Sequence, residues 1–470
     1  MASNTQWTTC GRKLLLNGKS FFIRGVNYAP TPIGLPGRLD MLGHEEIFMR
    51  DLVNLRDMHA NAVKTYDFNP EIDHSKYLDA AYNGGEKPIY SIFSIWIDQT
   101  LMEPVVDIDS PEFQAVVQGY YDMAKTTGNH PGVMGYSIGG EMNSIVVVND
   151  KAFWEKFALL TQAVRRGLKE NSGAQKIITT TFVDDGGMSF SAGGRYKADV
   201  DMWGSNVYQT NYPGSVIPTY MRVPGGKPLL VSEYGYPYAS NIAEGTEEEL
   251  HTVGKLLIKQ TVAMEANFNL TDSLKEQVLV GGFVFEYSDE WWKSGAENVH
   301  NLGGVMNRNF PMGWLSEEFF GLYRAVKSEE DNEHALDEMQ ARPTVDLIKA
   351  VWSKGSIAGE GDDYSSCAVS LGSTANLQLR HPLESPSPTG AVGSFIEGMF
   401  AVVALCALAL LAFAVYDTKM RRSRYRRLSP VLKPEEGSQS AHTRPSLHQS
   451  VAASRRYSQV VDGDENEAVV

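Results

Sequence analysis

Cysteine is scarce in this chain of 470 residues, which contains only Cys10, Cys367 and Cys406. Three cysteines are too few for a fold built on disulfides, and none forms a Cys-x-x-Cys pair, which disfavours a structural zinc site. Cys10 and Cys367 flank the expected folded region. Because the ends of a domain often lie close together, a bridge between these two cysteines stays open in an oxidising compartment.

Positive charge is also in short supply, since the formal net charge is −15 at pH 7. A protein that binds nucleic acid needs a basic surface to contact phosphates, so we expect no nucleic-acid partner. The sequence has no pair of histidines at metal-ligand spacing and no Gly-x-Ser-x-Gly nucleophile elbow. We therefore expect no metal and no cofactor, and a serine hydrolase is disfavoured.

One segment, residues 399–416, has no charged residue at all. Eighteen uncharged residues are near the minimum for a helix that crosses a bilayer, and six lysines and arginines follow between residues 419 and 427. The excess of positive charge predicts a cytoplasmic tail and an extracellular or lumenal N-terminal domain. The sequence thus predicts a Ser/Pro/Gly-rich linker at 355–398, one transmembrane helix at 399–416 and a basic, then polar, disordered tail at 417–470.

An apolar export signal is missing from residues 1–12. An exported domain requires such a signal, so we expect the natural transcript to extend upstream. Asn269-Leu270-Thr271 is a glycosylation sequon, which is compatible with a lumenal domain but also common by chance.

Residues 1–354 have the length and the pattern of one α/β domain, a (β/α)8 TIM barrel. Asn17-Gly18 predicts the turn of an opening hairpin, after which short apolar runs alternate with helical stretches. The rival, a doubly wound open sheet, usually has a glycine-rich phosphate turn after its first strand, and none is present. The predicted strands are 21–27, 62–66, 88–94, 133–138, 176–182, 202–207, 229–232 and 278–285, and the clearest helices are 45–58, 111–126, 150–169 and 247–267.

Two glutamates stand directly after predicted strands, Glu141 after the fourth and Glu233 after the seventh. Reactive side chains of a barrel lie at the C-terminal ends of its strands. Cleavage of a glycosidic bond with retention needs one carboxyl group as acid/base and a second as nucleophile, about 5–5.5 Å apart. One glutamate at a strand end is more often a structural ion pair, but this pair on these strands predicts glycosidase chemistry.

The segments 129–141 and 231–235 around these glutamates, with 22–28 and 61–66 on the first two strands, resemble the clan A retaining glycoside hydrolases. Within the clan, the similarity is greatest to the family 72 β-1,3-glucanosyltransferases, with families 2 and 5 as rivals. The resemblance covers about residues 11–326 and implies Glu141 as acid/base and Glu233 as nucleophile. It also implies a set of substrate-binding residues, namely Tyr28, Lys64, Asn143, Tyr208, Trp291 and Trp292. Of these, Tyr208 matches the clan tyrosine that hydrogen-bonds the nucleophile, and either Trp291 or Trp292 matches the tryptophan that stacks under the sugar.

Two positions depart from the clan pattern. Gly140 replaces the asparagine before the acid/base, which removes the usual hydrogen bond to the sugar 2-hydroxyl. Lys64 replaces an arginine and loses its bidentate geometry. Three further acidic residues, Glu286, Asp289 and Glu290, follow the eighth strand and are expected to line the cleft or to bind sugar hydroxyls.

The expected function is that of a retaining hydrolase or transglycosylase, which acts on a β-glucan-type polysaccharide through a glycosyl-enzyme intermediate. The alternative is a catalytically weak carbohydrate-binding or wall-anchoring membrane protein, which the two departures favour and the retained carboxylate pair opposes. The sugar, the linkage and the choice between hydrolysis and transfer stay open at this point.

Overall fold

The computed structural model describes residues 5–144, 148–171, 175–208, 216–223, 226–268, 278–328 and 336–367. The predicted membrane span 399–416, the tail 417–470 and the sequon at Asn269 lie outside these ranges. No helix within the described ranges is long and apolar enough to cross a membrane.

The central sheet is parallel throughout, and its strands match the eight predicted runs. Almost every strand residue is buried, as expected where helices cover the outer face and side chains fill the interior. The strands follow one another around the sheet in chain order, and the eighth run pairs with the first. In chain order they are β4 (Ile23–Asn27), β5 (Ala62–Lys64), β6 (Tyr90–Ile95), β7 (Val133–Ile138), β8 (Ile177–Thr180), β9 (Phe182–Val183), β10 (Trp203–Asn206), β11 (Leu229–Tyr234) and β12 (Leu279–Val284).

The fifth predicted strand is divided at Thr181 into β8, which pairs with β7, and β9, which pairs with β10. The side chain of Thr180 joins the two sides of this division, because its Oγ1 donates to the carbonyl of Gly204 and accepts from the Gly204 amide, both at 3.0 Å. A Cβ on Gly204 would lie 2.0 Å from the carbonyl oxygen of Thr180, so glycine permits this close approach. The sheet therefore closes on itself as a barrel.

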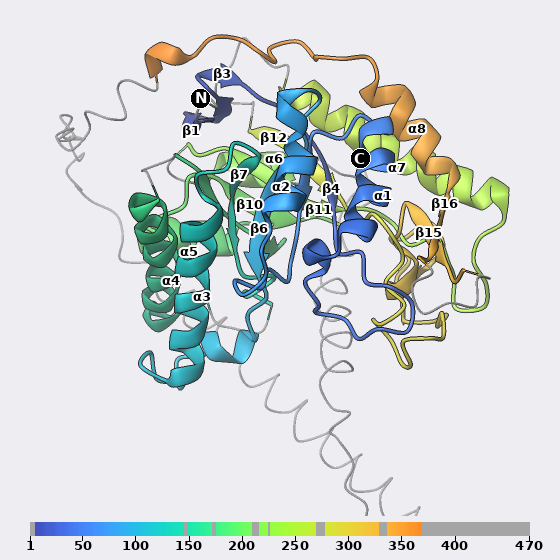
Figure 1. Cartoon of the computed structure of the whole chain (residues 1–470), viewed down its shortest axis with the longest axis horizontal. Coiled ribbons are helices and arrows are strands. Elements are labelled where there is room, and N and C mark those ends of the chain that lie inside the picture. The colour runs from blue at the N-terminus through green and yellow to red at the C-terminus, as the bar shows by residue number, and fades with distance from the viewer. Residues whose placement is uncertain are drawn as a thin grey trace, which may run out of the picture. The chain divides into compact units, whose positions relative to one another are not determined.

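A helix follows each of the eight strand runs, and all four helices predicted most clearly are present. Ser110 caps the third helix by accepting from the amide of Phe113, and Asp150 caps the fourth, which explains where these helices begin. Figure 1 shows helices α1 to α5 outside the strands. The helices are α1 (Glu45–Asp57), α2 (Ser75–Tyr82), α3 (Pro111–Thr127), α4 (Lys151–Glu170), α5 (Met188–Arg195), α6 (Val216–Met221), α7 (Glu247–Phe268) and α8 (Pro343–Trp352).

Shorter elements occupy the loops. The predicted hairpin is confirmed as β2 (Lys13–Leu16) and β3 (Lys19–Ser20), with Asn17 and Gly18 both at positive φ, and β1 (Trp7–Cys10) adds a third strand. The remaining short strands are β13 (Val305–Met306), β14 (Trp314–Leu315), β15 (Tyr323–Val326) and β16 (Glu338–Ala341), and the 3-10 helices are η1 (Met41–Gly43), η2 (Asn83–Gly85), η3 (Gln99–Met102) and η4 (Glu317–Phe319).

The N-terminal sheet covers the bottom of the barrel. Trp7 and Leu14 pack in one buried cluster with residues from the barrel strands, such as Ile92 and Val280. The amide of Trp7 also donates to the carbonyl of Gln175, just before β8. The bottom of the barrel is therefore sealed with apolar side chains, and the opposite end is left for the site.

The chain returns to this sealed end after α8 (Figure 1, orange). Arg24 forms a bidentate ion pair with Glu360, with nitrogen–oxygen distances of 3.1 and 2.8 Å, and a disulfide joins Cys10 to Cys367. The bridge that the sequence left open is thus present. These contacts attach residues 355–367, the first part of the predicted linker, to the barrel.

Candidate active site

Glu233 lies on β11 at the top of the barrel, with only 7% of its surface exposed, and two side-chain hydroxyls donate to its carboxylate. The hydroxyl of Tyr66 donates to its Oε1 at 2.7 Å, and the hydroxyl of Tyr208 donates to its Oε2 at 2.9 Å. Lys64 places its Nζ 3.7 Å from Oε1. Two hydroxyl donors and one ammonium group thus converge on this carboxylate.

Lys64 stands at the end of β5, fully buried, with its Nζ 3.6 Å from the centroid of the Tyr66 ring. Within the described residues, its Nζ makes the ion pair with Glu233 but no hydrogen bond. Burial lowers the pKa of Lys64 to about 8, although the charges of Glu233 and Glu141 oppose that shift. The lysine that replaces the clan arginine therefore still contacts the predicted nucleophile.

Glu141 reaches the site through an unusual turn after β7. Gly139 has a φ of +63°, and Glu141 itself has a φ of +48°, a left-handed conformation that costs a residue with a side chain about 1–2 kcal/mol. Its amide donates to the carbonyl of Thr181 at 2.6 Å, which fixes the turn against the division between β8 and β9. The predicted acid/base therefore occupies a strained position held by the neighbouring strand.

The environment of Glu141 differs from that of Glu233. Burial and, next in size, the charge of Glu233 together raise the pKa of Glu141 to about 7, although a hydrogen bond from Asn206 opposes them. A carboxyl group with this pKa can hold its proton near neutral pH, as an acid/base requires.

Asn206 connects the two glutamates and was not identified from the sequence. It ends β10, lies opposite Glu233 in the ladder between β10 and β11, and donates from Nδ2 to Oε1 of Glu141 at 2.8 Å. Its own Oδ1 accepts from the hydroxyl of Ser232 at 2.8 Å, which fixes the orientation of the amide. Its place two residues before Tyr208 at a strand end is the signal that could have singled it out.

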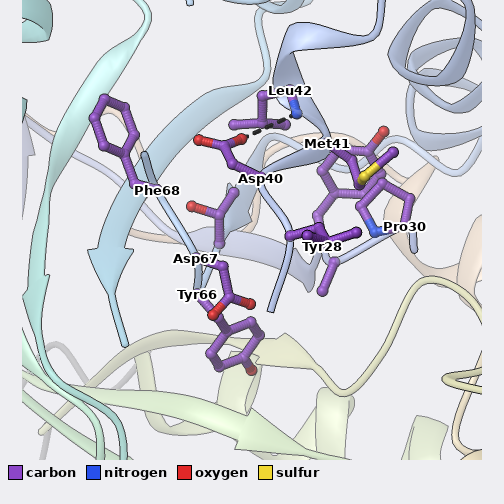
Figure 2. Close-up of a pocket in the computed structure, with 11 residues that line it drawn as sticks. Tyr28, Pro30, Asp40, Met41, Leu42, Tyr66, Asp67 and Phe68 are labelled. Atoms are coloured by element: carbon purple, nitrogen blue, oxygen red, sulfur yellow. Dashed lines mark hydrogen bonds between the residues drawn. The ribbon is translucent and has the colours of Figure 1, made fainter. Parts of the chain in front are cut away.

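Tyr66 is the second residue that the sequence reasoning missed, although it closes the segment 61–66 that carried the resemblance. It also lines a pocket between the β4–α1 loop and the segment after β5 (Figure 2). Tyr66 and Asp67 lie at one end of this pocket and Asp40 and Leu42 at the other. The pocket therefore lies next to the predicted nucleophile.

More carboxyl groups surround the pair than sequence reasoning expected. Glu317, in η4 after the eighth strand, is near enough for its charge to raise the pKa of Glu141. Burial raises the pKa of Glu286 well above its usual range, and the charge of Glu290 adds to this. Lys293 lies 2.5 Å from Glu290 and is the cation of this group, so Glu290 makes an ion pair at the place where we expected a sugar ligand.

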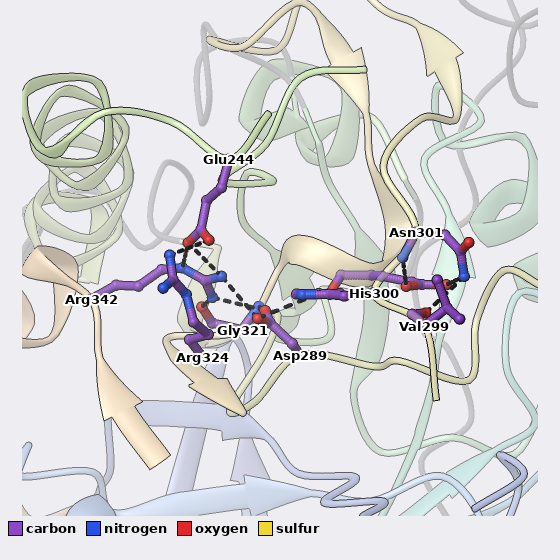
Figure 3. Close-up of polar contacts among 9 residues, drawn as sticks. Glu244, Asp289, Val299, His300, Asn301, Gly321, Arg324 and Arg342 are labelled. Carbon is purple, nitrogen blue, oxygen red and sulfur yellow. Dashed lines mark hydrogen bonds and ion pairs between the residues drawn. The ribbon is translucent and has the colours of Figure 1, made fainter. Parts of the chain in front are cut away.

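Asp289 does not line the cleft as expected. Arg342 binds both of its oxygens at 2.8 Å and also contacts Glu244, which in turn accepts from Arg324 (Figure 3). The Asp289 side chain has no exposed surface. A buried bidentate ion pair of this kind fixes the loop after β12 to the start of α8, so the carboxylate has a structural role.

The tryptophans after β12 are partly covered by protein. A Cβ on Gly37 would lie 2.0 Å from the Trp292 ring, so the backbone of the β4–α1 loop rests on that ring. Trp291 stacks on His300 with centroids 4.5 Å apart. Each ring therefore has a protein neighbour, and their role as sugar platforms stays a prediction.

Tyr28 and Asn143 use their polar groups within the protein. The hydroxyl of Tyr28 donates to Asp51 at 3.0 Å, and the amide of Asn143 donates to the carbonyl of Val183 at 2.9 Å. Both contacts brace the walls of the barrel mouth. Of the eight predicted site residues, Glu141, Glu233, Lys64 and Tyr208 are those that the contacts above bring together.

Comparison with known proteins supports the resemblance read from the motifs. The family model described as glucanosyltransferase, of glycoside hydrolase family 72, matches residues 4–179, a segment that includes Glu141 but ends before Glu233. The chain is a relative of the family 72 glucanosyltransferases. The match beyond residue 179 comes from individual family members.

Among curated family 72 proteins, the 1,3-beta-glucanosyltransferase GAS5 of Saccharomyces cerevisiae is 24% identical over 294 residues, 58% of this chain and 54% of GAS5. The probable 1,3-beta-glucanosyltransferase GAS3 of the same yeast is 28% identical over 156 residues, 32% of this chain and 28% of GAS3. The chain thus spans about half or less of the length of these relatives.

Solved structures share the fold. Yeast Gas2 in complex with a small compound superposes with a TM-score of 0.51 at 17% identity, covering 78% of this chain and 73% of Gas2. A GH2 beta-galacturonidase from Eisenbergiella tayi superposes with the same score at 13% identity, covering 75% of this chain and 54% of that enzyme. At such low identity, these likenesses establish the barrel and leave the substrate to other arguments.

Proposed function

We propose that this chain is a retaining β-1,3-glucan-active enzyme, a transglycosylase or hydrolase, with Glu233 as nucleophile and Glu141 as acid/base. The observation that carries the proposal is the contrast between the two carboxyls. Glu233 accepts from two tyrosine hydroxyls and pairs with Lys64, whereas burial raises the pKa of Glu141 to about 7. Glu141 can therefore hold a proton for the leaving oxygen near neutral pH, while the contacts of Glu233 fix the orientation of its carboxylate for attack.

In the first step, a carboxylate oxygen of Glu233 attacks the anomeric carbon and forms an ester as the glycosidic C–O bond breaks. Glu141 gives its proton to the departing sugar oxygen. In the second step, Glu141 takes a proton from an incoming hydroxyl, which attacks the same carbon and releases Glu233. The products are those of hydrolysis if the hydroxyl belongs to water and those of transfer if it belongs to a second glucan chain.

The relatives support a glucan substrate. Two of them are named as 1,3-beta-glucanosyltransferases, one as probable, and a yeast Gas2 structure contains laminaritetraose and laminaripentaose (16% identity, TM-score 0.50). Their names also favour transfer over hydrolysis. The catalytically weak binding protein remains the rival, because Gly140 removes a side chain that clan members use on the substrate.

The decisive experiment uses a 2-fluoro glucoside with a good leaving group. We expect a stable adduct on Glu233, detected by intact mass and peptide mapping, with Glu233→Gln as the control that cannot form it. Incubation with β-1,3-linked glucose oligosaccharides then separates the two reactions, because transfer gives products longer than the substrate. An unlabelled protein that binds these oligosaccharides without changing them would support the rival.

We also propose that residues 399–416 hold the chain in a membrane, with the barrel extracellular or lumenal and the tail after residue 416 cytoplasmic. The disulfide between Cys10 and Cys367 supports an extracellular or lumenal barrel, since such bonds persist in oxidising compartments. Protease protection on intact cells and on sealed microsomes tests the orientation. A barrel digested on the cytoplasmic side would reverse it.

A further inference from the structure

Trp96 follows the last residue of β6 and is exposed at 40%. It is the exposed tryptophan among those that the structure describes. A large aromatic ring is usually buried, and one that stays open at the C-terminal end of a barrel strand is placed where ligands bind.

Arg38 covers part of this ring. Its guanidinium lies 4.5 Å from the centroid of Trp96 and 5.7 Å from that of Trp292, so it stands between the two rings. It also lies 3.7 Å from a carboxylate oxygen of Asp67. Arg38 is itself 45% exposed at its side chain, which leaves several of its donors accessible.

Asp67 connects this exposed pair to the centre of the site. It lines the pocket of Figure 2 beside Tyr66, and Tyr66 donates its hydroxyl to Glu233. A continuous series of contacts thus runs from the nucleophile through the pocket to Trp96. A sugar bound at Trp96 would be joined to the sugar at Glu233 along this route.

The other aromatic residues at the mouth are less free. Gly37 rests on Trp292 and His300 stacks on Trp291. The neighbour of Trp96 is the long side chain of Arg38, whose guanidinium can turn toward a ligand. The apolar face of a hexose can therefore stack on Trp96 with the smallest rearrangement of the protein.

We propose that Trp96, Arg38 and Asp67 form a remote subsite that binds a neutral hexose unit of the glucan chain, a unit other than the one attacked. The inference rests on the proposed function, whose substrate it specifies. Trp96 supplies the stacking face, and Arg38 and Asp67 supply a donor and an acceptor for neighbouring hydroxyls. The Arg38–Asp67 pair is electrically balanced, and Glu290 and Lys293 near Asp67 pair with each other, so the subsite offers no net positive charge to an acidic sugar and suits a neutral one.

The test is the dependence of kcat/KM on the number of linked glucose units, from two to six. For Trp96→Ala, we expect the loss to grow with chain length and to reach about tenfold on the longest oligosaccharide. Arg38→Ala should shift the profile in the same direction. Val53→Ala removes an exposed apolar side chain in the C-terminal half of α1, the half farther from the β4–α1 loop, and serves as the matched control. An equal loss at every length, or no loss, would overturn the subsite.

A binding measurement separates this inference from the proposed function. Calorimetric titration of the full chain with the same oligosaccharides, and with oligogalacturonate of equal length, requires no turnover. If no glucan is converted but affinity for long glucans still falls with Trp96→Ala, the subsite stands and the catalytic proposal fails. Absence of glucan binding, affinity that does not depend on Trp96, or preference for the uronate would each overturn the subsite.

Discussion

The two ends of the barrel differ in how their charged side chains are paired. At the bottom, Arg24 has a bidentate carboxylate partner in Glu360 and also donates to the backbone carbonyl of Gly355. At the top, Glu141 is buried beside Glu233, and the cation Lys64 has an ion pair but no hydrogen bond within the described residues. Carboxyl groups are concentrated at the top, and several of them have raised pKa values.

The asparagines show the same contrast. Asn61 at the bottom uses its amide to join two strands, accepting from the amide of Arg24 and donating to the carbonyl of Phe22. Asn206 at the top directs its amide to the carboxylate of Glu141. The polar side chains named at the bottom join strands and stabilise the fold, whereas those at the top contact the two predicted catalytic carboxyls.

The largest expected effect comes from the two glutamates. Glu141→Ala and Glu233→Ala should each lower kcat by about 10³- to 10⁴-fold, because each removes one of the two groups that break the bond. The fold should persist, because neither glutamate is part of the sealed end of the barrel. Circular dichroism and thermal unfolding check this. Wild-type turnover in either variant would refute the role of that residue.

At the opposite end, Arg24→Ala should lower the free energy of unfolding by about 3–5 kcal/mol, because it leaves Glu360 buried without its partner. The kcat of the molecules that remain folded should be unchanged. Denaturant titration measures the loss. Lys349→Ala breaks an exposed pair with Asp57 and should cost less than about 1 kcal/mol. Equal effects of the two variants would show that burial does not strengthen the Arg24–Glu360 pair.

Asn206→Ala tests how the top controls protonation. The hydrogen bond from Asn206 favours the charged form of Glu141, so its loss should raise the pKa of Glu141 above its present value of about 7. Glu141 would then keep its proton to higher pH, and the alkaline limb of the kcat/KM profile should shift to higher pH. We also expect kcat to fall about tenfold, since a hydrogen bond to a charged group is lost.

Asn61→Ala is the matched control for this pH profile. It should reduce stability and leave the alkaline limb in place, because Asn61 bonds to backbone groups at the bottom of the barrel. An alkaline limb that shifts to lower pH in Asn206→Ala would contradict the predicted rise in the pKa of Glu141.

The smallest effect is expected at Gly140. A Cβ there meets no heavy atom within 4 Å, and the residue is outside the positive-φ region, so asparagine fits without strain. Gly140→Asn should raise kcat/KM severalfold on a substrate with a 2-hydroxyl, measured against its 2-deoxy analogue. No change would indicate that another group already binds this hydroxyl.

The local pattern of apolar and polar residues was sufficient to predict much of the fold. Apolar runs separated by helical stretches located all eight strand runs, because a strand buried on both faces must be apolar along its length. The same pattern placed Glu141 and Glu233 at strand ends. The division of the fifth strand at Thr181 could not be predicted, since it depends on the closure of the barrel between β8 and β10.

The sequence by itself thus determined the barrel and the two glutamates, because strand periodicity and strand ends are local properties of the chain. The resemblance also pointed to the contact between Tyr208 and Glu233. Only the tertiary structure decided that Tyr66 donates to Glu233, that Asn206 donates to Glu141, and that Asp289 pairs with Arg342. These contacts join residues far apart in the chain. Their partners depend on side-chain direction and on strand register, which form only when the barrel closes.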